Sequence, residues 1–95
     1  MGNLFLHLGN DNYVNLDTVK LITSANAEKV RKYRTDRKID KNSDAFFNGS
    51  SDRETRSMIL FRDGSICTSS VSAKVLNDRA KNLAKEIKGV VKAED

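Results

Sequence analysis

The feature of this sequence that most constrains its fold is an Asp-Gly pair, Asp63-Gly64, set between two short runs of β-forming residues. A two-residue hairpin turn of the common type needs positive φ at both positions, and Asp-Gly is one of the pairs that supply it. The pair therefore predicts a β-hairpin with Asp63 and Gly64 as its turn. In that hairpin Phe61 faces Ile66 across the two strands.

This register makes both faces of the hairpin apolar. One face carries Ile59, Phe61 and Ile66, and the other carries Met58, Leu60 and Cys67. Strands that are apolar on both faces are buried on both faces, so each face needs a cover. A chain of 95 residues can cover one face with its own helices, and we expect the second face to need a partner subunit.

Strands and a first helix are expected before the hairpin. Alternating residues predict strands over 4–8 and 13–16, followed by a short extended segment over 19–22. A helix with a thin apolar stripe is then expected to run to about Arg37 or Lys38. Three residues offer an N-cap for this helix: Thr23, Ser24 and Asn26.

A loop and a final helix complete the chain. The polar stretch 41–52 predicts a loop that either Phe46 or Phe47 anchors to the core. Ser72 is the expected N-cap of a helix that ends near Val91. The apolar seam of that helix consists of Leu76, Ala80, Leu83, Ile87 and Val90. Such a seam packs on a sheet or forms a contact between the helices of two subunits, and both interpretations stay open.

Together these elements predict a single domain over 1–95, with a core over about 4–88 and a frayed tail at 92–95. The fold class is α+β, a small antiparallel sheet with two helices. No apolar run approaches the roughly 18 residues of a membrane span, and the N-terminus lacks the pattern of a signal peptide. With one cysteine in the chain, we expect a protein of the reducing cytoplasm that does not bind membranes.

Positive charge is concentrated in the stretch 29–41. The seven basic residues of this stretch are Lys29, Arg31, Lys32, Arg34, Arg37, Lys38 and Lys41, against Asp36 and Asp40. The stretch therefore carries +5, although the whole chain carries +4. A local positive field of this kind favours polyanions. The alternative is a helix face that is simply solvated, as many runs of Lys and Arg are.

The sequence offers little to catalysis or to metal binding. Its one histidine, His7, is expected at a strand edge, and its one cysteine, Cys67, is expected to be a buried, inert thiol. Asp36, Asp40 and Asp44 recur every four residues, and pairing with nearby Lys and Arg explains them more simply than a metal does. No nucleophile, base and orienting group come together. We expect no enzyme, no metal, no cofactor and no small-molecule substrate.

Three segments taken together resemble one protein family. They are Phe5–Gly9, the arginine-rich strand entry Arg53–Leu60, and the Ser-rich stretch with its helix, Thr68–Arg79. In kind and order they are similar to the small bacterial extracellular matrix regulatory proteins, which include the Rem-type regulators of biofilm matrix genes. The resemblance implies a ββαββα unit similar to LytTR-type DNA-binding domains. It also implies assembly into rings and binding to double-stranded DNA as a transcriptional regulator.

The same resemblance places DNA contacts at two positions of this chain. A cluster of arginines at the start of the third strand falls on Arg53 and Arg56, with Glu54 at a position that is basic in the DNA-binding member. A basic residue after the second strand falls on Thr18, with Lys20 close by.

Two functions are compatible with these features. The first is an oligomeric DNA-binding regulator that contacts phosphates, with contacts from Arg53, Arg56, Lys20, Lys29, Arg31, Lys32, Arg34, Arg37 and Lys38. The second is a protein-interaction or scaffold module of the same fold that has lost DNA binding. The concentrated positive charge favours the first, whereas Glu54 and Thr18 favour the second.

Overall fold

A computed structural model describes residues 4–94 of the chain, with side chains up to Ala84. In chain order the elements are β1 (Phe5–Gly9), β2 (Asn12–Asn15), a turn of 3-10 helix (Leu16–Thr18), β3 (Val19–Ser24), α1 (Ala27–Asp36), β4 (Phe46–Phe47), β5 (Ser57–Phe61), β6 (Ile66–Ser69) and α2 (Ala73–Glu94). The α+β class is confirmed. The segment expected to be merely extended is a full strand, β3, so three strands precede the first helix instead of two.

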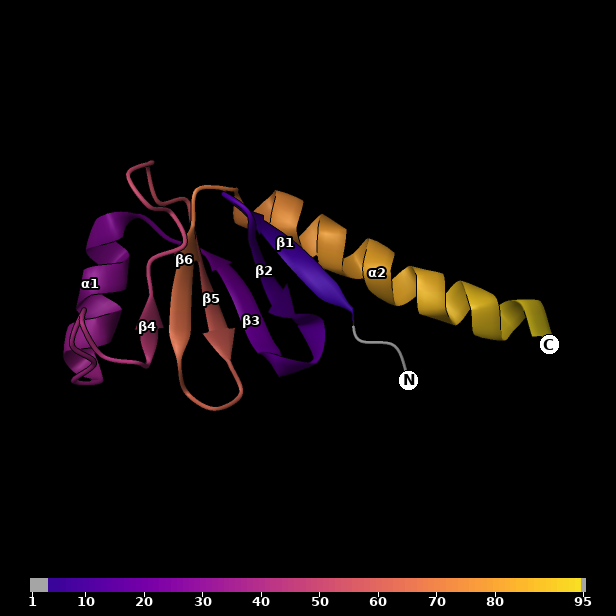
Figure 1. The fold of residues 1–95 in the computed structure, drawn as a ribbon, viewed down its shortest axis with the longest axis horizontal. Coiled ribbons are helices and arrows are strands. Elements are labelled where there is room, and N and C mark those ends of the chain that lie inside the picture. The colour runs from indigo at the N-terminus through magenta and orange to yellow at the C-terminus, as the bar shows by residue number, and fades with distance from the viewer. Residues whose placement is uncertain (1–3, 95) are drawn as a thin grey trace.

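The strands form two sheets (Figure 1). β1 and β2 make an antiparallel pair, and the main sheet has the order β3-β5-β6-β4. β4 is parallel to β6, while the other neighbours in the main sheet are antiparallel. The turn between β5 and β6 lies at one end of this sheet, and the loop between β4 and β5 lies at the opposite end (Figure 1).

The β5–β6 hairpin exists, but its predicted register was wrong by one residue. The Phe61 amide donates to the Ser65 carbonyl at 2.9 Å, and the Gly64 amide donates to the Phe61 carbonyl at 3.0 Å. The loop therefore has three residues, and only its last one, Gly64, takes a positive φ, +93°. The Asp63 carboxylate accepts bonds from the amide and the hydroxyl of Ser65, at 2.8 and 2.6 Å, which favours this wider turn.

The shift of one residue changes which faces the β6 side chains occupy. Leu60 pairs with Ile66, and Ile59 pairs with Cys67. Because side chains alternate between faces, Ile66 and Cys67 exchange the faces that the two-residue turn predicts for them.

The first face of the main sheet is covered by the β1–β2 pair and the start of α2. The larger core forms here from Leu6, Leu8, Ile22, Ile59, Cys67, Ala73 and Leu76. Ala80 and Leu83 of the predicted α2 seam pack against it, so the seam lies on the protein over this length. Ile87 and Val90 lie beyond the described side chains.

The second face of the main sheet is covered by α1. The smaller core consists of Ala25, Val30, Met58 and Ile66, with Tyr33, Phe46 and Leu60 packed at its margin. Both faces of β5 are therefore covered within one chain, and the expectation that a partner subunit covers the second face was wrong.

Caps fix the starts of both helices as the sequence indicates. Of the three candidate caps of α1, Asn26 is used: its side-chain oxygen accepts the Lys29 amide at 2.8 Å. The Ser72 hydroxyl accepts the Val75 amide at 3.3 Å at the start of α2. α2 runs to Glu94, past the end expected near Val91, and no helix over residues 4–94 is long and apolar enough to cross a membrane. Fraying at 92–95 and the single-domain assignment stay predictions.

Candidate nucleic-acid interface

Residues 48–56, the arginine loop, carry Arg53 and Arg56 and are held by the turn between β1 and β2. The Asn10 side-chain amide donates to the carbonyls of Gly49 and Ser50, at 3.2 and 3.3 Å. The Asn12 side-chain amide donates to the Gly49 carbonyl at 3.3 Å. Asn10 and Asn12 lie 37 to 40 residues from their acceptors in the sequence, so no local pattern could have indicated these contacts.

The arginine loop is also fitted closely against β6. A Cβ atom at Gly49 would lie 2.2 Å from the Thr68 carbonyl oxygen, so only glycine fits there without a shift. The Asn48 side-chain oxygen accepts the Thr68 hydroxyl at 2.9 Å and the Ser50 amide at 3.1 Å. The loop that presents the two arginines is therefore bonded at its base to two other parts of the fold.

Arg56 and Lys29 line one hollow beside the start of α1, with a volume of about 390 Å³. The Arg56 amide donates to the Ser69 carbonyl at 2.9 Å, and the Arg56 carbonyl accepts the Ala25 amide at 3.1 Å. These two bonds fix the backbone of Arg56 between β6 and the entry to α1. The start of a helix carries a partial positive charge that favours anions. Glu54 also lines this hollow and opposes that charge.

The outward side of α1 carries Lys29, Arg31 and Lys32, here called the α1 cations; all three are exposed. Between residues 4 and 84 the only ion pair within 4.0 Å joins Lys74 to Asp78, at 3.4 Å. The expectation that Asp36, Asp40 and Asp44 pair with neighbouring basic residues was therefore wrong within this range. The α1 cations have no carboxylate partner there, and their charge faces solvent.

Arg34 of α1 and Arg37, which directly follows α1, lie against aromatic rings. The Arg34 guanidinium is 4.9 Å from the centre of the Phe46 ring and donates to the Ile39 carbonyl at 3.3 Å. Its Nε is buried and has no acceptor among the described residues. Arg37 lies over the Tyr33 ring at 4.0 Å. Arg34 is thus directed toward the protein, unlike the α1 cations.

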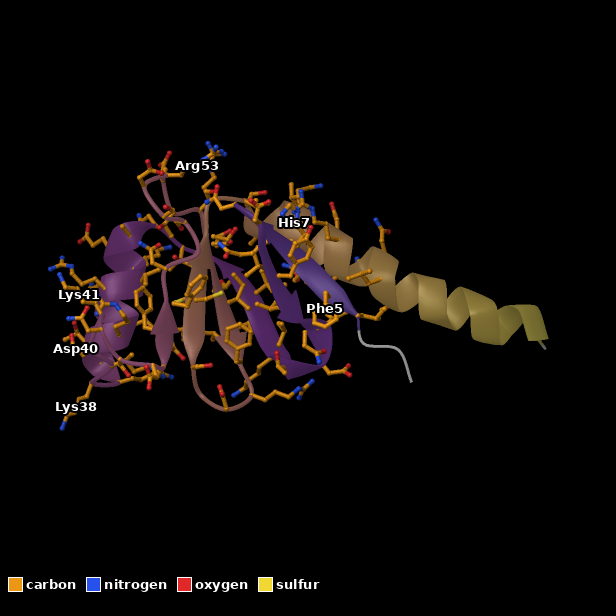
Figure 2. The ribbon with its side chains drawn as sticks, viewed as in Figure 1. Phe5, His7, Lys38, Asp40, Lys41 and Arg53 are labelled. Atoms are coloured by element: carbon orange, nitrogen blue, oxygen red, sulfur yellow. The ribbon has the colours of Figure 1, made fainter. Side chains whose placement is uncertain are left out.

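The nine predicted contact residues do not form one patch. Arg53 lies at the end of the molecule formed by the arginine loop, whereas Lys38 lies just after the C-terminal end of α1 (Figure 2). Lys20 and Arg37 line a separate hollow near Lys38. An α-helix rises about 1.5 Å per residue, so the 10 residues of α1 separate its two ends by about 15 Å. The predicted contact residues therefore form two groups, one near each end of α1.

Thr18, at one of the contact positions that the resemblance implies, has a local structural role. Its hydroxyl donates to the Asn15 carbonyl at 2.6 Å, and its carbonyl accepts the Arg62 amide at 2.9 Å. Lys20 is the extra residue where the register of β3 against β5 shifts between Val19 and Leu21.

The remaining reactive side chains lie apart from these cations. His7 stacks on Tyr13 with ring centres 4.7 Å apart. Burial raises the pKa of Cys67 from 9.0 to about 12, so this thiol stays protonated at neutral pH. No group of three His, Cys, Asp or Glu among the described residues is arranged to hold a metal ion.

The fold and its surface define a class: small α+β proteins in which a cationic helix and a braced arginine loop flank one sheet. The sequence matches the RemA-like family, described as extracellular matrix regulatory protein A-like, over residues 5–80. The chain therefore belongs to this family, and the predicted resemblance is confirmed. The family is one of regulatory proteins and not of enzymes. A comparison with curated proteins gave no match.

Proposed function

We propose that this protein is an oligomeric transcriptional regulator in the cytoplasm that binds double-stranded DNA through phosphate contacts and controls genes of the biofilm matrix. Membership of a family of extracellular matrix regulatory proteins supports this proposal. The single observation that carries it is the exposed, unpaired state of the α1 cations. Unpaired cations release condensed counterions when they meet phosphates, which drives sequence-independent DNA binding.

The proposed contacts are the α1 cations together with Arg53 and Arg56. Lys29 and Arg56 line the same hollow, and this places the arginine loop beside the first turn of α1. Arg34 is left out of the proposed interface because its guanidinium is engaged by Phe46 and Ile39.

An apolar surface supports the proposed assembly of several copies. Phe5 and Tyr13 are 54 % and 61 % exposed on the β1–β2 pair, although both are large and apolar. Phe5, His7 and Leu83 line a shallow hollow of about 230 Å³ between β1 and α2. Figure 2 shows Phe5 and His7 along β1, away from the α1 cations. Copies joined through this surface would present several cationic helices to one DNA duplex, which multiplies a weak single contact.

The test of DNA binding is a titration of random-sequence duplex DNA over a series of salt concentrations. Affinity should fall with a slope of about −0.9 in log–log form per phosphate neutralised. Arg53→Gln combined with Arg56→Gln should reduce the slope by about two if each arginine meets one phosphate. Lys81→Gln, an exposed cation of α2, is the matched control and should leave the slope unchanged.

Glu54 provides a sharper test. Glu54→Arg removes a carboxylate from the hollow that Lys29 and Arg56 line, so it should strengthen DNA binding. An unchanged affinity in this variant, together with dispensable Arg53 and Arg56, would show that the arginine loop is not the contact.

The second candidate function is a protein-interaction module whose α1 cations meet an acidic protein. Glu54 favours it because a carboxylate in the hollow repels phosphate, and Thr18 favours it because that position carries no charge. If duplex DNA shows no salt-dependent binding at low ionic strength, the DNA-binding proposal fails and this candidate replaces it.

A further inference from the structure

A second hollow of about 330 Å³ lies at the far end of α1, next to the β5–β6 turn. We name it the hairpin hollow, and its lining is Lys20, Tyr33, Arg37, Ile39, Leu60, Phe61, Arg62, Gly64 and Ser65. Its volume is near the lower end of the roughly 300–1,000 Å³ that small-molecule sites occupy.

Three cations reach the hairpin hollow from three different segments. Lys20 comes from β3, Arg37 follows the last residue of α1, and Arg62 begins the hairpin loop. Lys20 is the extra residue of a bulge, and bulges commonly redirect a side chain toward a site. The three side chains line the same hollow, although 17 residues of sequence separate Lys20 from Arg37 and 25 separate Arg37 from Arg62.

The guanidinium groups of the hairpin hollow are oriented by the protein. Arg62 Nε donates to the Asp17 carbonyl at 2.9 Å, which leaves its two terminal nitrogens without a bond among the described residues. The guanidinium carbon of Arg37 lies over the Tyr33 ring, 4.0 Å from its centre. Two oriented guanidinium groups match the geometry of a phosphate or carboxylate group.

Among the residues with described side chains, no carboxylate lines the hairpin hollow. The nearest in sequence, Asp63, accepts two hydrogen bonds from Ser65, and these bonds lower its pKa. Neither Lys20, Arg37 nor Arg62 forms an ion pair within 4.0 Å in the described part of the chain. The carbonyls at the end of α1 are taken up by the backbone amides of Arg37, Lys38 and Ile39, so they do not compete for these cations.

Part of the remaining lining is apolar and half-buried. Ile39 and Leu60 supply aliphatic surface, and Tyr33 supplies a ring. Phe61 also lines the hollow, although its side chain packs against the larger core. A solvated inorganic ion gains nothing from such walls, whereas a flat ring attached to an anionic group gains from the walls and the cations together.

We propose that the hairpin hollow binds a small organic anion in which a phosphate group is joined to an aromatic ring, of the size of a mononucleotide. The phosphate lies between Lys20, Arg37 and Arg62, and the ring lies against Ile39 and Leu60. This site is separate from the arginine loop and does not depend on DNA binding.

The test is an NMR titration of the full chain with adenosine 5′-monophosphate in the absence of DNA. We expect saturable shifts at the amides around Lys20, Arg37 and Arg62, with a Kd of about 1 mM or below. Adenosine alone and inorganic phosphate alone should each bind at least about tenfold more weakly, because each supplies half of the contacts. Lys20→Gln and Arg62→Gln should each weaken binding about tenfold, and Lys81→Gln should not change it.

Three results would overturn the proposal. One is no saturable shift up to about 10 mM nucleotide, ten times the expected Kd. Another is binding of inorganic phosphate as tight as that of the nucleotide, which would show that the apolar walls contribute nothing. The third is a set of shifts confined to the hollow of Lys29 and Arg56. Since no DNA is present, each of these results leaves the outcome of the DNA titration unaffected.

Discussion

The two faces of the main sheet are built differently. On the face toward β1, β2 and α2, four large side chains, Leu6, Leu8, Ile59 and Leu76, have 0 % exposure, and Cys67 has 1 %. On the face toward α1, the core residues keep 2–6 % exposure, and α1 itself buries only Val30. The margin of that face is closed by Arg34 on Phe46 and Arg37 on Tyr33.

This difference in burial between the two faces explains how so small a chain can carry so much charge. A helix that places one residue fully in the core has most of its surface free for other residue types. α1 is held by its Asn26 cap, by Val30 and by the guanidinium groups of Arg34 and Arg37 that lie on aromatic rings. Stability is therefore concentrated on one face, and charge is concentrated on the other.

The largest effect is expected from the larger core. Leu76→Ala should lower the free energy of unfolding by about 2–5 kcal/mol, the usual range for a buried leucine. Val30→Ala in the smaller core should cost less, because fewer atoms are removed and the site lies nearer to solvent. Urea unfolding of both variants measures the difference, and equal losses would contradict the contrast between the faces.

The second-largest loss of stability is expected where Gly49 of the arginine loop contacts β6. Gly49→Ala places a methyl group against the Thr68 carbonyl oxygen, and such overpacking costs about 1–3 kcal/mol. The arginine loop should shift, so DNA affinity should fall together with the melting temperature. Ser51→Ala, at an exposed position of the same loop, is the control and should change neither quantity.

A smaller effect is expected at the turn that assigns β6 side chains to the two faces. Gly64→Val should cost about 1 kcal/mol, because Gly64 has a φ of +93° that a β-branched residue resists. A Cβ atom there would meet no atom within 4 Å, so the loss comes from the backbone alone. Gly64→Asn should lose less, since asparagine tolerates positive φ better. A melting temperature for Gly64→Val equal to that of the wild type would show that the turn accepts the strain.

The smallest effect is expected from the titration of Asp63. Hydrogen bonds from the Ser65 hydroxyl and amide lower the pKa of this exposed carboxyl from 3.8. Its contribution to stability is therefore present above pH 3.8 and is lost as the pH falls through the lowered value. Asp63→Asn should lack this part of the acid dependence. If the melting temperatures of the two proteins fall equally as the pH is lowered to about 3, the expectation is contradicted.

The local elements of the fold could be predicted from the sequence. Alternation indicated the strands, and Asn26 and Ser72 indicated where the helices begin. The register of the hairpin could not be predicted from Asp63-Gly64 alone, because the bonds between Asp63 and Ser65 select a loop one residue wider. The cover on both faces of β5 depends on how distant strands pack, which no local pattern records.

The candidate site was predictable as a set of residues but not as an arrangement. The sequence indicated every cation, whereas their division between the two ends of α1 follows from the direction of that helix. One signal was overlooked. Val30, Tyr33 and Arg34 recur at helical spacing on one face, so Arg34 could have been assigned to the inner side of α1.

The larger core joins the first strand of the chain to its last helix. Arg79 Nη1 donates to the His7 carbonyl at 2.9 Å across 72 residues, and Leu6 and Leu8 share a core with Leu76. A ribosome delivers Leu6 and Leu8 long before it delivers Leu76. The smaller core needs nothing beyond Ile66. During synthesis the charged half of the protein is therefore complete in sequence first, and the half that carries the stability closes only when the C-terminal helix has emerged.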